Sequence, residues 1–209
     1  MSPFDSSQSS VKKATISTSS LNAIMELPVG PLVSTTPAAF PSRQSLNGKY
    51  TAIVPLQKDH SDVLFKHLGG AENGDRWTYM LGGPFAEIEQ WEPVVGNWCE
   101  VQDTIFFSIF SRPIDDPESE PAGMISYLNI VPSHRRIEIG SVILGEELKG
   151  TRQATEAFYL FIKHAFEDLG YLRVEWKANK LNQPSLTAAE RLGFTFEGIF
   201  RYYCTDICL

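Results

Sequence analysis

The strongest hydrophobic period in the chain starts at residue 154 and predicts an amphipathic helix that ends at Gly170. Its apolar positions recur every three or four residues and form one stripe, which is typical of a helix packed against a sheet. Apolar segments at 137–144 and 172–178 flank the helix and predict two strands, which run parallel because a helical crossover joins them. The stripe consists of Ala154, Ala157, Phe158, Phe161, Ala165 and Leu169.

Alternating and β-branched segments predict the other strands, and three of them follow one another as an antiparallel meander at 104–111, 123–131 and 137–144. Further helices are predicted before Gly69-Gly70 and after Asn182, which is a suitable N-cap. The predicted strands are 49–56, 104–111, 123–131, 137–144, 172–178 and 194–200, and the two further helices are 59–68 and 182–192.

The N-terminal part of the chain lacks a hydrophobic period. Residues 1–20 are half Ser or Thr, so we expect a disordered leader over 1–26. Residues 27–45 carry four of the thirteen prolines and predict an extended arm that lies on the domain. The rest, 46–209, is expected to form a single domain of ordinary size.

Composition excludes several classes of function. A net charge of −7 and a pI near 5.1 argue against a nucleic-acid partner, which a basic face would bind. No run of about 18 apolar residues exists, so no membrane span is expected. Three cysteines are too few for a disulfide framework or a zinc site, which favours a reducing, cytoplasmic compartment. The four histidines show no metal-ligand spacing, so we expect no metal.

Residues 149–154 connect the strand at 137–144 to the long helix. A turn at a helix start leaves backbone N–H groups unpaired at the positive end of the helix dipole, which makes a site for a pyrophosphate. Such turns are common, and this one alone is a weak signal. Further on, Asn182, Ser185 and residues 191–194 follow in the order and spacing of one large enzyme family.

In these elements the chain resembles the GNAT family of acyl-CoA N-acyltransferases, in particular the Rim-type branch, which acetylates the α-amino groups of ribosomal proteins. The resemblance covers residues 46–201 and is strongest in 137–171, 173–185 and 188–201. It implies an α/β (α+β) domain: a mixed, mostly antiparallel central sheet has helices on both faces, and a parallel pair of strands splays apart at the coenzyme site.

The resemblance also implies acetyl-CoA as the co-substrate, with its pantetheine arm in the splayed gap and its pyrophosphate on the turn. A purely structural helix start is the alternative interpretation of that turn. Where the family has Gly, this chain has Arg152, whose guanidinium either grips phosphate or crowds it. The expected coenzyme contacts are Ser141, Val142, Ile143, Lys149, Gly150, Thr151, Arg152, Gln153, Ala154, Thr155, Asn182 and Ser185.

Amine acylation needs a base for the amine, a polarised thioester carbonyl and a proton for the departing thiolate. Glu138 is the predicted general base, and a strand carboxylate that faces solvent or pairs with Arg135 or Arg173 is its alternative. A backbone N–H near Val142 is expected to polarise the carbonyl. Many family members protonate the thiolate with a Tyr at the position of Ala189, so Ser185 is the predicted donor here, with a structural Ser as its alternative.

Aromatic residues are dense between residues 76 and 98. Trp77 and Tyr79, with Phe85 behind them, lie where the family builds its acceptor pocket, so they are predicted to contact the substrate or else to pack. For Trp91 and Trp98 we expect packing against the sheet.

Three functions remain open from sequence. The first is an N-acetyltransferase that acts on a primary amine, in a small metabolite or a peptide N-terminus, by direct transfer in a ternary complex. A catalytically impaired acyl-CoA-binding protein is the second, and a GNAT fold reused for other chemistry on a bulky metabolite is the third. Family members carry one more strand after the position of Arg201, and without it the strands at 172–178 and 194–200 have open edges. We therefore expect a homodimer through the C-terminal region.

Overall fold

The computed structural model describes residues 30–201 and residue 203. The predicted leader, 1–26, and most of the C-terminal tail lie outside the described residues. The chain divides into two units, Met1–Thr35 and Thr36–Leu209, and the fold below is that of the second. Its first ten residues form no helix or strand.

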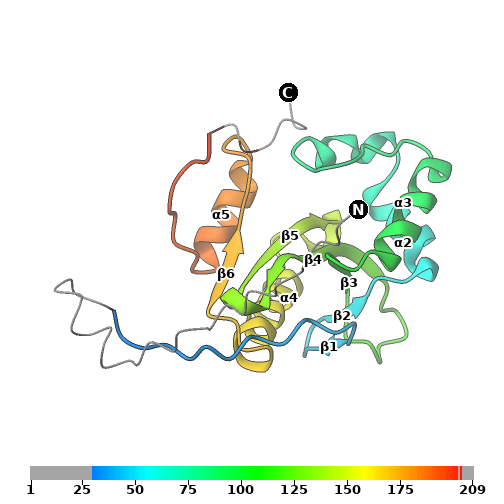
Figure 1. Cartoon of the computed structure of the whole chain (residues 1–209). Coiled ribbons are helices and arrows are strands. Elements are labelled where there is room, and N and C mark those ends of the chain that lie inside the picture. Colours follow the sequence, from blue (N-terminus) through cyan, green and yellow to red (C-terminus); the bar gives the residue numbers. More distant parts are fainter. Residues whose placement is uncertain (1–29, 202, 204–209) are drawn as a thin grey trace, which may run out of the picture. The chain divides into compact units, whose positions relative to one another are not determined.

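Six strands form one sheet in the order β1 to β6 (Figure 1). Neighbours are antiparallel from β1 to β5, whereas β5 and β6 run parallel. This arrangement confirms the predicted mixed, mostly antiparallel sheet with one parallel pair. The strands are β1 (Leu46–Asn47), β2 (Ala52–Pro55), β3 (Ile105–Phe110), β4 (Pro121–Val131), β5 (Arg136–Leu144) and β6 (Arg173–Trp176).

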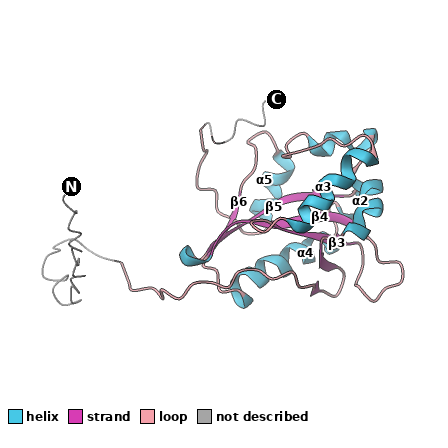
Figure 2. Ribbon diagram, turned by 45° about the vertical axis from the view of Figure 1, so that its right-hand side comes forward, coloured by secondary structure: helices cyan, strands magenta, loops and turns pink. Residues whose placement is uncertain are grey.

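Helices cover both faces of the sheet, as predicted (Figure 2). The apolar stripe of α4 packs on one face, while α2 and α3 bury a second core cluster against the other. The α-helices are α2 (Ser61–Leu68), α3 (Ile88–Glu100), α4 (Arg152–Lys163) and α5 (Gln183–Arg191). Shorter helical turns are η1 (Lys58–His60), η2 (Ala71–Trp77), η3 (Pro132–His134), η4 (Glu146–Leu148) and the π-helix η5 (His164–Asp168). No helix in the described part is long and apolar enough to cross a membrane.

The long predicted helix changes from α to π geometry after Lys163. Just before this change, α4 makes a contact in the core. The Tyr127 ring stacks on the Phe161 ring with centroids 3.7 Å apart, and the Tyr127 hydroxyl donates to the Phe161 carbonyl oxygen. That carbonyl lies one turn before the π segment. Burial raises the pKa of Tyr127 far above its usual value, so the hydroxyl stays a donor.

The predicted strand at 194–200 is wrong, because these residues form an irregular segment. Their hydrophobic alternation suits a strand, but a strand also needs a neighbour with which to form a hydrogen-bonded ladder. None of the backbone groups from 195 to 200 is bonded within the described residues. Only side chains tie the segment to the sheet, through a bidentate pair between Arg173 and Glu197 at 2.6 and 2.8 Å.

Candidate active site

The pairing of β5 with β6 ends before β5 does. The last parallel pair is Ile139 with Trp176, whereas β5 continues to Leu144. Within the described residues no strand adjoins 140–144 on that side. Their backbone groups therefore face the place where the two strands separate, and the separation matches the splayed pair expected from sequence.

A β-bulge lies at the point of separation. Met124 pairs with Ile143 and Ser126 with Gly140, so β5 carries one residue more than β4 over this stretch. Ser141 adopts a positive φ of 49°, which is uncommon outside glycine. The bulge turns the Ile143 side chain into the α2–α3 core, where it is 5% exposed, while Ser141 and Val142 stay half-buried beside the gap.

The N-terminus of α4 lies just beyond this end of β5. Thr151 is its N-cap and accepts from the Ala154 N–H through its side chain at 3.2 Å and from the Thr155 N–H through its carbonyl at 3.2 Å. Its own N–H donates to Leu148. Three of the five predicted pyrophosphate donors from 151 to 155 are thus engaged within the protein.

The N–H groups of Gly150, Arg152 and Gln153 make no hydrogen bond within the described residues. Together with the helix dipole they could accept an anion, and the pyrophosphate site at this turn stays a prediction. Gly150 has a φ of 71°, so any other residue would be strained there.

Arg152 neither enters the core nor blocks the turn, because its guanidinium stacks 4.9 Å from the centroid of the Tyr50 ring. The Lys49 ammonium lies 5.2 Å from the same centroid. Lys49 first and Arg152 second lower the pKa of the Tyr50 hydroxyl through hydrogen bonds and charge. Both cations therefore lie over the Tyr50 ring, while Lys149 is paired with Glu146 at 3.0 Å.

Glu138 lies in the middle of β5 and is 6% exposed. One carboxylate oxygen, Oε2, accepts from the Asn129 amide at 2.8 Å and from the Lys177 ammonium. The other oxygen, Oε1, has no partner among the described residues. The structure therefore shows neither of the alternatives expected from sequence, a carboxylate that faces solvent or one that pairs with Arg135 or Arg173.

Glu175 stands opposite Glu138 in the parallel register, and Lys177 bridges the two carboxylates, with its ammonium 2.7 Å from Glu175. Burial raises the pKa of Glu175, but the hydrogen bonds from Lys177 and Arg173 outweigh it, and the net pKa is lowered. Burial likewise lowers the pKa of Lys177, and its bonds to both carboxylates outweigh that and raise it. The site therefore holds the Lys177 ammonium between the carboxyl groups of Glu138 and Glu175.

Ser185 lies in the first turn of α5, close to the end of β6. Its backbone N–H donates to the side chain of the N-cap Asn182 at 3.2 Å, and its hydroxyl oxygen accepts from the Trp176 indole at 3.0 Å. The hydroxyl proton of Ser185 thus remains available to donate. Trp176 is also the last β6 residue that pairs with β5, so this hydroxyl is held at the place where the strands part.

The aromatic segment contributes mainly to packing. Trp77 is 4% exposed and donates its indole N–H to the Leu68 carbonyl at 2.7 Å, and Phe85 packs edge-on against it. Both side chains belong to the α2–α3 core, together with the buried Trp91, and Trp98 packs against that core. Of the three predicted substrate contacts, only the half-buried Tyr79 lies outside this core, and its contact with the acceptor stays a prediction.

Lys177, Glu175 and Asn129 were not predicted from the sequence. A signal existed for two of them: Arg173, Glu175 and Lys177 alternate in a strand, so their side chains share the face on which Glu138 lies. Asn129 gave no such signal, because its amide reaches Glu138 only through a bulge with a φ of 46°.

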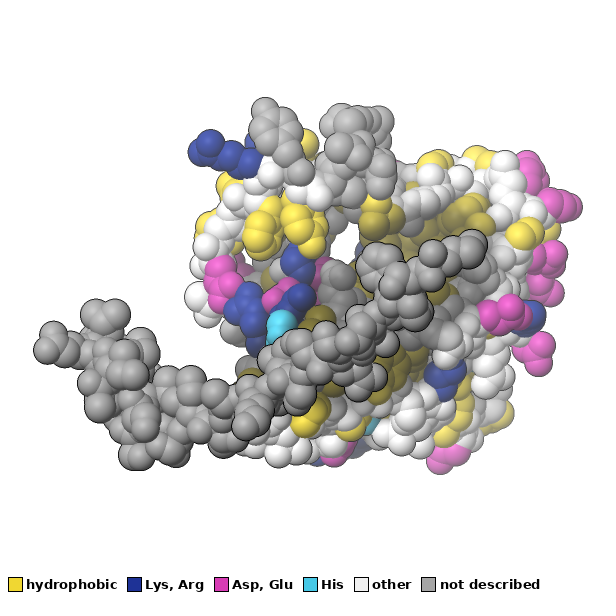
Figure 3. Space-filling view, viewed as in Figure 1, with side chains coloured by type: hydrophobic (Ala, Val, Ile, Leu, Met, Phe, Trp, Pro, Cys, Tyr) yellow, Lys and Arg dark blue, Asp and Glu magenta, His cyan; other side chains and the backbone are white. Residues whose placement is uncertain are grey.

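The face that carries these groups is hollowed between the side of β6 and α5 and the side of α2 and α3 (Figure 3). Hydrophobic side chains line part of the rim, and Lys, Arg, Asp and Glu side chains gather beside the hollow. A splayed parallel pair, a helix N-terminus with free N–H groups and a buried carboxylate are features that an acyl-CoA-dependent transferase uses.

Comparison with known proteins gives the same class. The family model described as acetyltransferase (GNAT) domain matches residues 52–195, more than half of the chain. The chain therefore belongs to the GNAT family. It is a GNAT N-acetyltransferase, for which the family implies acetyl-CoA as co-substrate.

Individual relatives agree with the family assignment. The chain is 28% identical over 160 residues to "Uncharacterized N-acetyltransferase p20" of Bacillus licheniformis, covering 74% of this chain and 85% of that one. A GCN5-related N-acetyltransferase from Brucella melitensis is 36% identical, with a TM-score of 0.75 over 81% of this chain and 75% of that chain.

The fold extends to the Rim-type branch. An acetyl transferase of Salmonella typhimurium that modifies the N-terminal serine of a 50S ribosomal subunit protein has a TM-score of 0.60 at 18% identity. The match covers 74% of this chain and 87% of that chain. At this identity the likeness is one of fold.

The bridge between Glu138 and Glu175 generates a prediction about stability. Lys177→Met leaves the buried Glu138 without its cation, while Glu175 keeps its bond to Arg173, and should lower the free energy of unfolding by about 3 kcal/mol near pH 7. Loss of the cation raises the pKa of both carboxylates in the folded state, so the deficit should shrink as the pH falls toward 4. Urea unfolding at several pH values measures it.

The double variant Lys177→Met/Glu138→Gln is the control, because it removes one charge of each sign. It should recover part of the stability that Lys177→Met loses near pH 7. Equal stability of Lys177→Met and the unmodified protein from pH 4 to 7 would contradict the bridge.

Proposed function

We propose that this chain transfers an acetyl group from acetyl-CoA to a primary amine, in a small metabolite or a peptide N-terminus, by direct transfer in a ternary complex. The observation that carries the proposal is the unpaired stretch of β5 at 140–144, which leads to the free N–H groups of 150, 152 and 153. An extended thioester arm and a pyrophosphate need these two features side by side.

The coenzyme is held by backbone more than by side chains. Backbone groups of Ser141 to Ile143 bind the pantetheine arm as a partner strand would, and the turn binds the pyrophosphate. Arg152 and Lys49 place positive charge next to that turn, which adds to the attraction of the helix dipole. At the far end of the gap, Asn182 and Ser185 lie near the thiol.

Glu138 acts as the general base through Oε1, the oxygen that Asn129 and Lys177 leave free. The amine loses a proton to this oxygen, directly or through water, and its nitrogen attacks the thioester carbonyl carbon. The bulge N–H near Val142 stabilises the charge that develops on the carbonyl oxygen.

Collapse of the intermediate breaks the carbon–sulfur bond, and the thiolate needs a proton. The Ser185 hydroxyl supplies it and takes back the proton that the acylated nitrogen must lose to become an amide. The Trp176 indole donates to the hydroxyl oxygen, so the hydroxyl proton is free for this step. This assignment accounts for Ala189, which replaces the Tyr that many family members use.

A second candidate is binding of acyl-CoA without turnover. It is favoured by the same Lys177 contact, because an ammonium that neutralises Glu138 competes with the amine for that carboxylate. Turnover on any amine separates the two candidates.

The acceptor is a cationic amine under this proposal. Its ammonium suits the carboxylates of Glu138 and Glu175, and the net charge of −7 adds weak steering. The Salmonella relative acts on a serine N-terminus, so peptides that begin with serine belong in the first acceptor panel. Cys99 is a free thiol, which supports the reducing, cytoplasmic location that we also propose.

The turn gives a prediction about coenzyme affinity. Thr151→Asp keeps an N-cap, because Asp caps helices as well as Thr does, but it adds a negative charge beside the pyrophosphate. The Kd of acetyl-CoA should rise at least tenfold, about 1.4 kcal/mol, in calorimetric titration.

Thr151→Asn is the matched control, since it caps the helix without charge and should bind acetyl-CoA nearly as the unmodified protein does. Equal affinity of the Asp and Asn variants would place the pyrophosphate elsewhere.

The base assignment predicts a split between turnover and binding. Glu138→Gln should lower kcat by about 100-fold or more with little change in the Kd of acetyl-CoA, because the carboxylate acts on the amine. The acidic limb of the pH–rate profile should also disappear. Glu190→Gln, on the exposed side of α5, is the control and should keep the rate. Full activity of Glu138→Gln at every pH would exclude Glu138 as the base.

We also propose that two copies associate through the β6 edge. Within the described residues β6 ends the sheet. Exposed apolar side chains lie directly before it and in the C-terminal segment that Glu197 ties to Arg173. Together these side chains favour association over exposure to water. They are Leu172, Phe196, Ile199, Phe200 and Tyr203, each 60–75% exposed.

Light scattering at micromolar concentration should therefore give the mass of a dimer. Phe196→Ser/Ile199→Ser should shift it to a monomer, while Leu81→Ser, at an exposed site in the loop before α3, should not. A monomeric unmodified protein, or a dimer that both substitutions leave intact, would refute the interface.

A further inference from the structure

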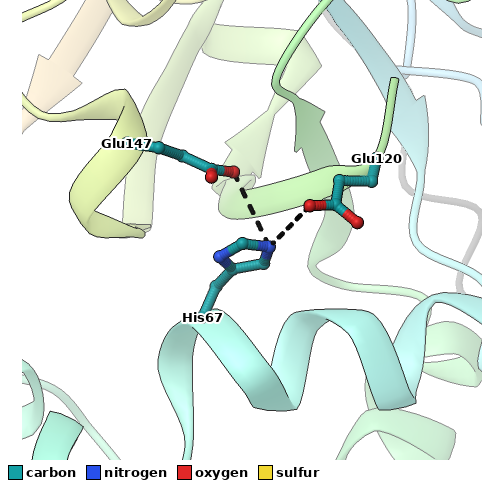
Figure 4. Close-up of side chains that lie close together, drawn as sticks. All are labelled: His67, Glu120 and Glu147. Atoms are coloured by element: carbon teal, nitrogen blue, oxygen red, sulfur yellow. Dashed lines mark hydrogen bonds and ion pairs between the residues drawn. The ribbon is translucent and has the colours of Figure 1, made fainter. Parts of the chain in front are cut away.

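Three side chains from distant parts of the sequence converge outside the active site (Figure 4). His67 comes from the last turn of α2, Glu120 directly precedes β4, and Glu147 lies in η4. One ligand atom from each lies within 4.8 Å of the others. Spacing in the sequence could not show this group, because the fold alone brings residues 67, 120 and 147 together.

The distances suit a metal ion. The Nε2 atom of His67 is 3.3 Å from Oε1 of Glu120 and 3.6 Å from Oε1 of Glu147. Zinc bonds of roughly 2.0–2.2 Å at tetrahedral angles separate neighbouring ligand atoms by about 3.3 Å. Small side-chain rotations therefore bring all three atoms to zinc-binding distance.

The charges around the group are unbalanced. Neither Glu120 nor Glu147 has a Lys or Arg partner within the described residues, although the neighbouring Glu146 pairs with both Arg76 and Lys149. Two carboxylates that share one imidazole repel each other unless a cation lies between them. A metal ion bound among the three side chains would supply that cation.

The imidazole is held in position by close packing. A Cβ atom at Gly145 would lie 2.6 Å from the Ala122 carbonyl oxygen and 3.2 Å from the His67 Cβ, so only glycine lets η4 approach α2 this closely. The His67 side chain is 18% exposed, whereas the two carboxylates lie at the surface. One fixed nitrogen and two adjustable oxygens, open to solvent on one side, form a site that an ion can enter.

We propose that His67, Glu120 and Glu147 bind one zinc ion with a water molecule as the fourth ligand. One nitrogen and two oxygens are ligands that zinc accepts, and the ligand set resembles no magnesium or calcium site because of its imidazole. The ion joins α2, the start of β4 and η4, and so stabilises the segment that leads into the turn at 149–154. The site does not depend on the catalytic assignments above.

Zinc and cobalt titrations test the proposal in a background with Cys99→Ser, Cys204→Ser and Cys208→Ser, since thiolates also bind these metals. Competition with a chromogenic chelator should give one zinc per chain. Cobalt(II) should develop the strong visible absorption of a four-coordinate site. The melting temperature of the full chain should rise with zinc.

In that background His67→Ala should abolish the single zinc site, and Glu120→Gln or Glu147→Gln should weaken it at least tenfold. His134→Ala, at an exposed histidine in η3, should have no effect. The Glu variants alter surface side chains and keep the test valid if His67→Ala fails to fold. Absence of stoichiometric zinc binding, or binding that all three ligand variants retain, would overturn the proposal and leave a protonated His67 ion pair only.

Discussion

The active site depends on where the hydrogen bonds between β5 and β6 stop. The two strands pair over four residues each, and β5 then continues to Leu144 with β4 as its only neighbouring strand among the described residues. Backbone N–H and C=O groups need partners, so an unpaired stretch inside a domain persists only where another group can complete the ladder. The bulge at Ser141 turns the strand there, and the helix that follows starts with its own unpaired N–H groups. Both features of the coenzyme site are therefore backbone features, which tolerate many side chains.

The same parallel register determines the charges at the site. Pairing Glu138 with Glu175 places two carboxylates side by side on one face, and Lys177 two residues later reaches both. Burial alone would raise the pKa of a carboxylate and lower that of a lysine, but here the contacts reverse both shifts. The lysine stabilises the folded chain and also occupies the place to which a cationic amine would be attracted. Under the proposed mechanism, Lys177 and the cationic acceptor compete for the carboxylate of Glu138.

Much of the fold could be predicted from the sequence, because periodicity reports which face of an element is buried. The apolar stripe of α4 predicted its packing, and the crossover predicted the parallel direction of β6. The prediction of a strand at 194–200 is wrong, because alternation of apolar and polar residues suits a strand but does not show that a neighbouring strand is present to pair with it. Trp77 and Phe85 pack in the core. The sequence left open whether they pack or contact the substrate, because the answer depends on how η2 folds over α2.

Residues of the candidate site could be named from the sequence where their order and spacing along the chain indicated them. Glu138, Ser185 and the turn at 149–154 are found by position within their elements. Contacts that arise from bulges or from distant segments were not visible, as in the amide of Asn129 or the group around His67. A local sequence pattern indicates propensity and burial, whereas these contacts depend on how the whole chain folds.

Amide hydrogen exchange, resolved to single residues with and without CoA, tests the central claim most directly. The backbone amides on the open side of β5 between 140 and 144, and those of Gly150, Arg152 and Gln153, should exchange fast in the free protein and become protected when CoA saturates it. Saturating CoA that protects other segments and leaves these amides exchanging as before would contradict the account.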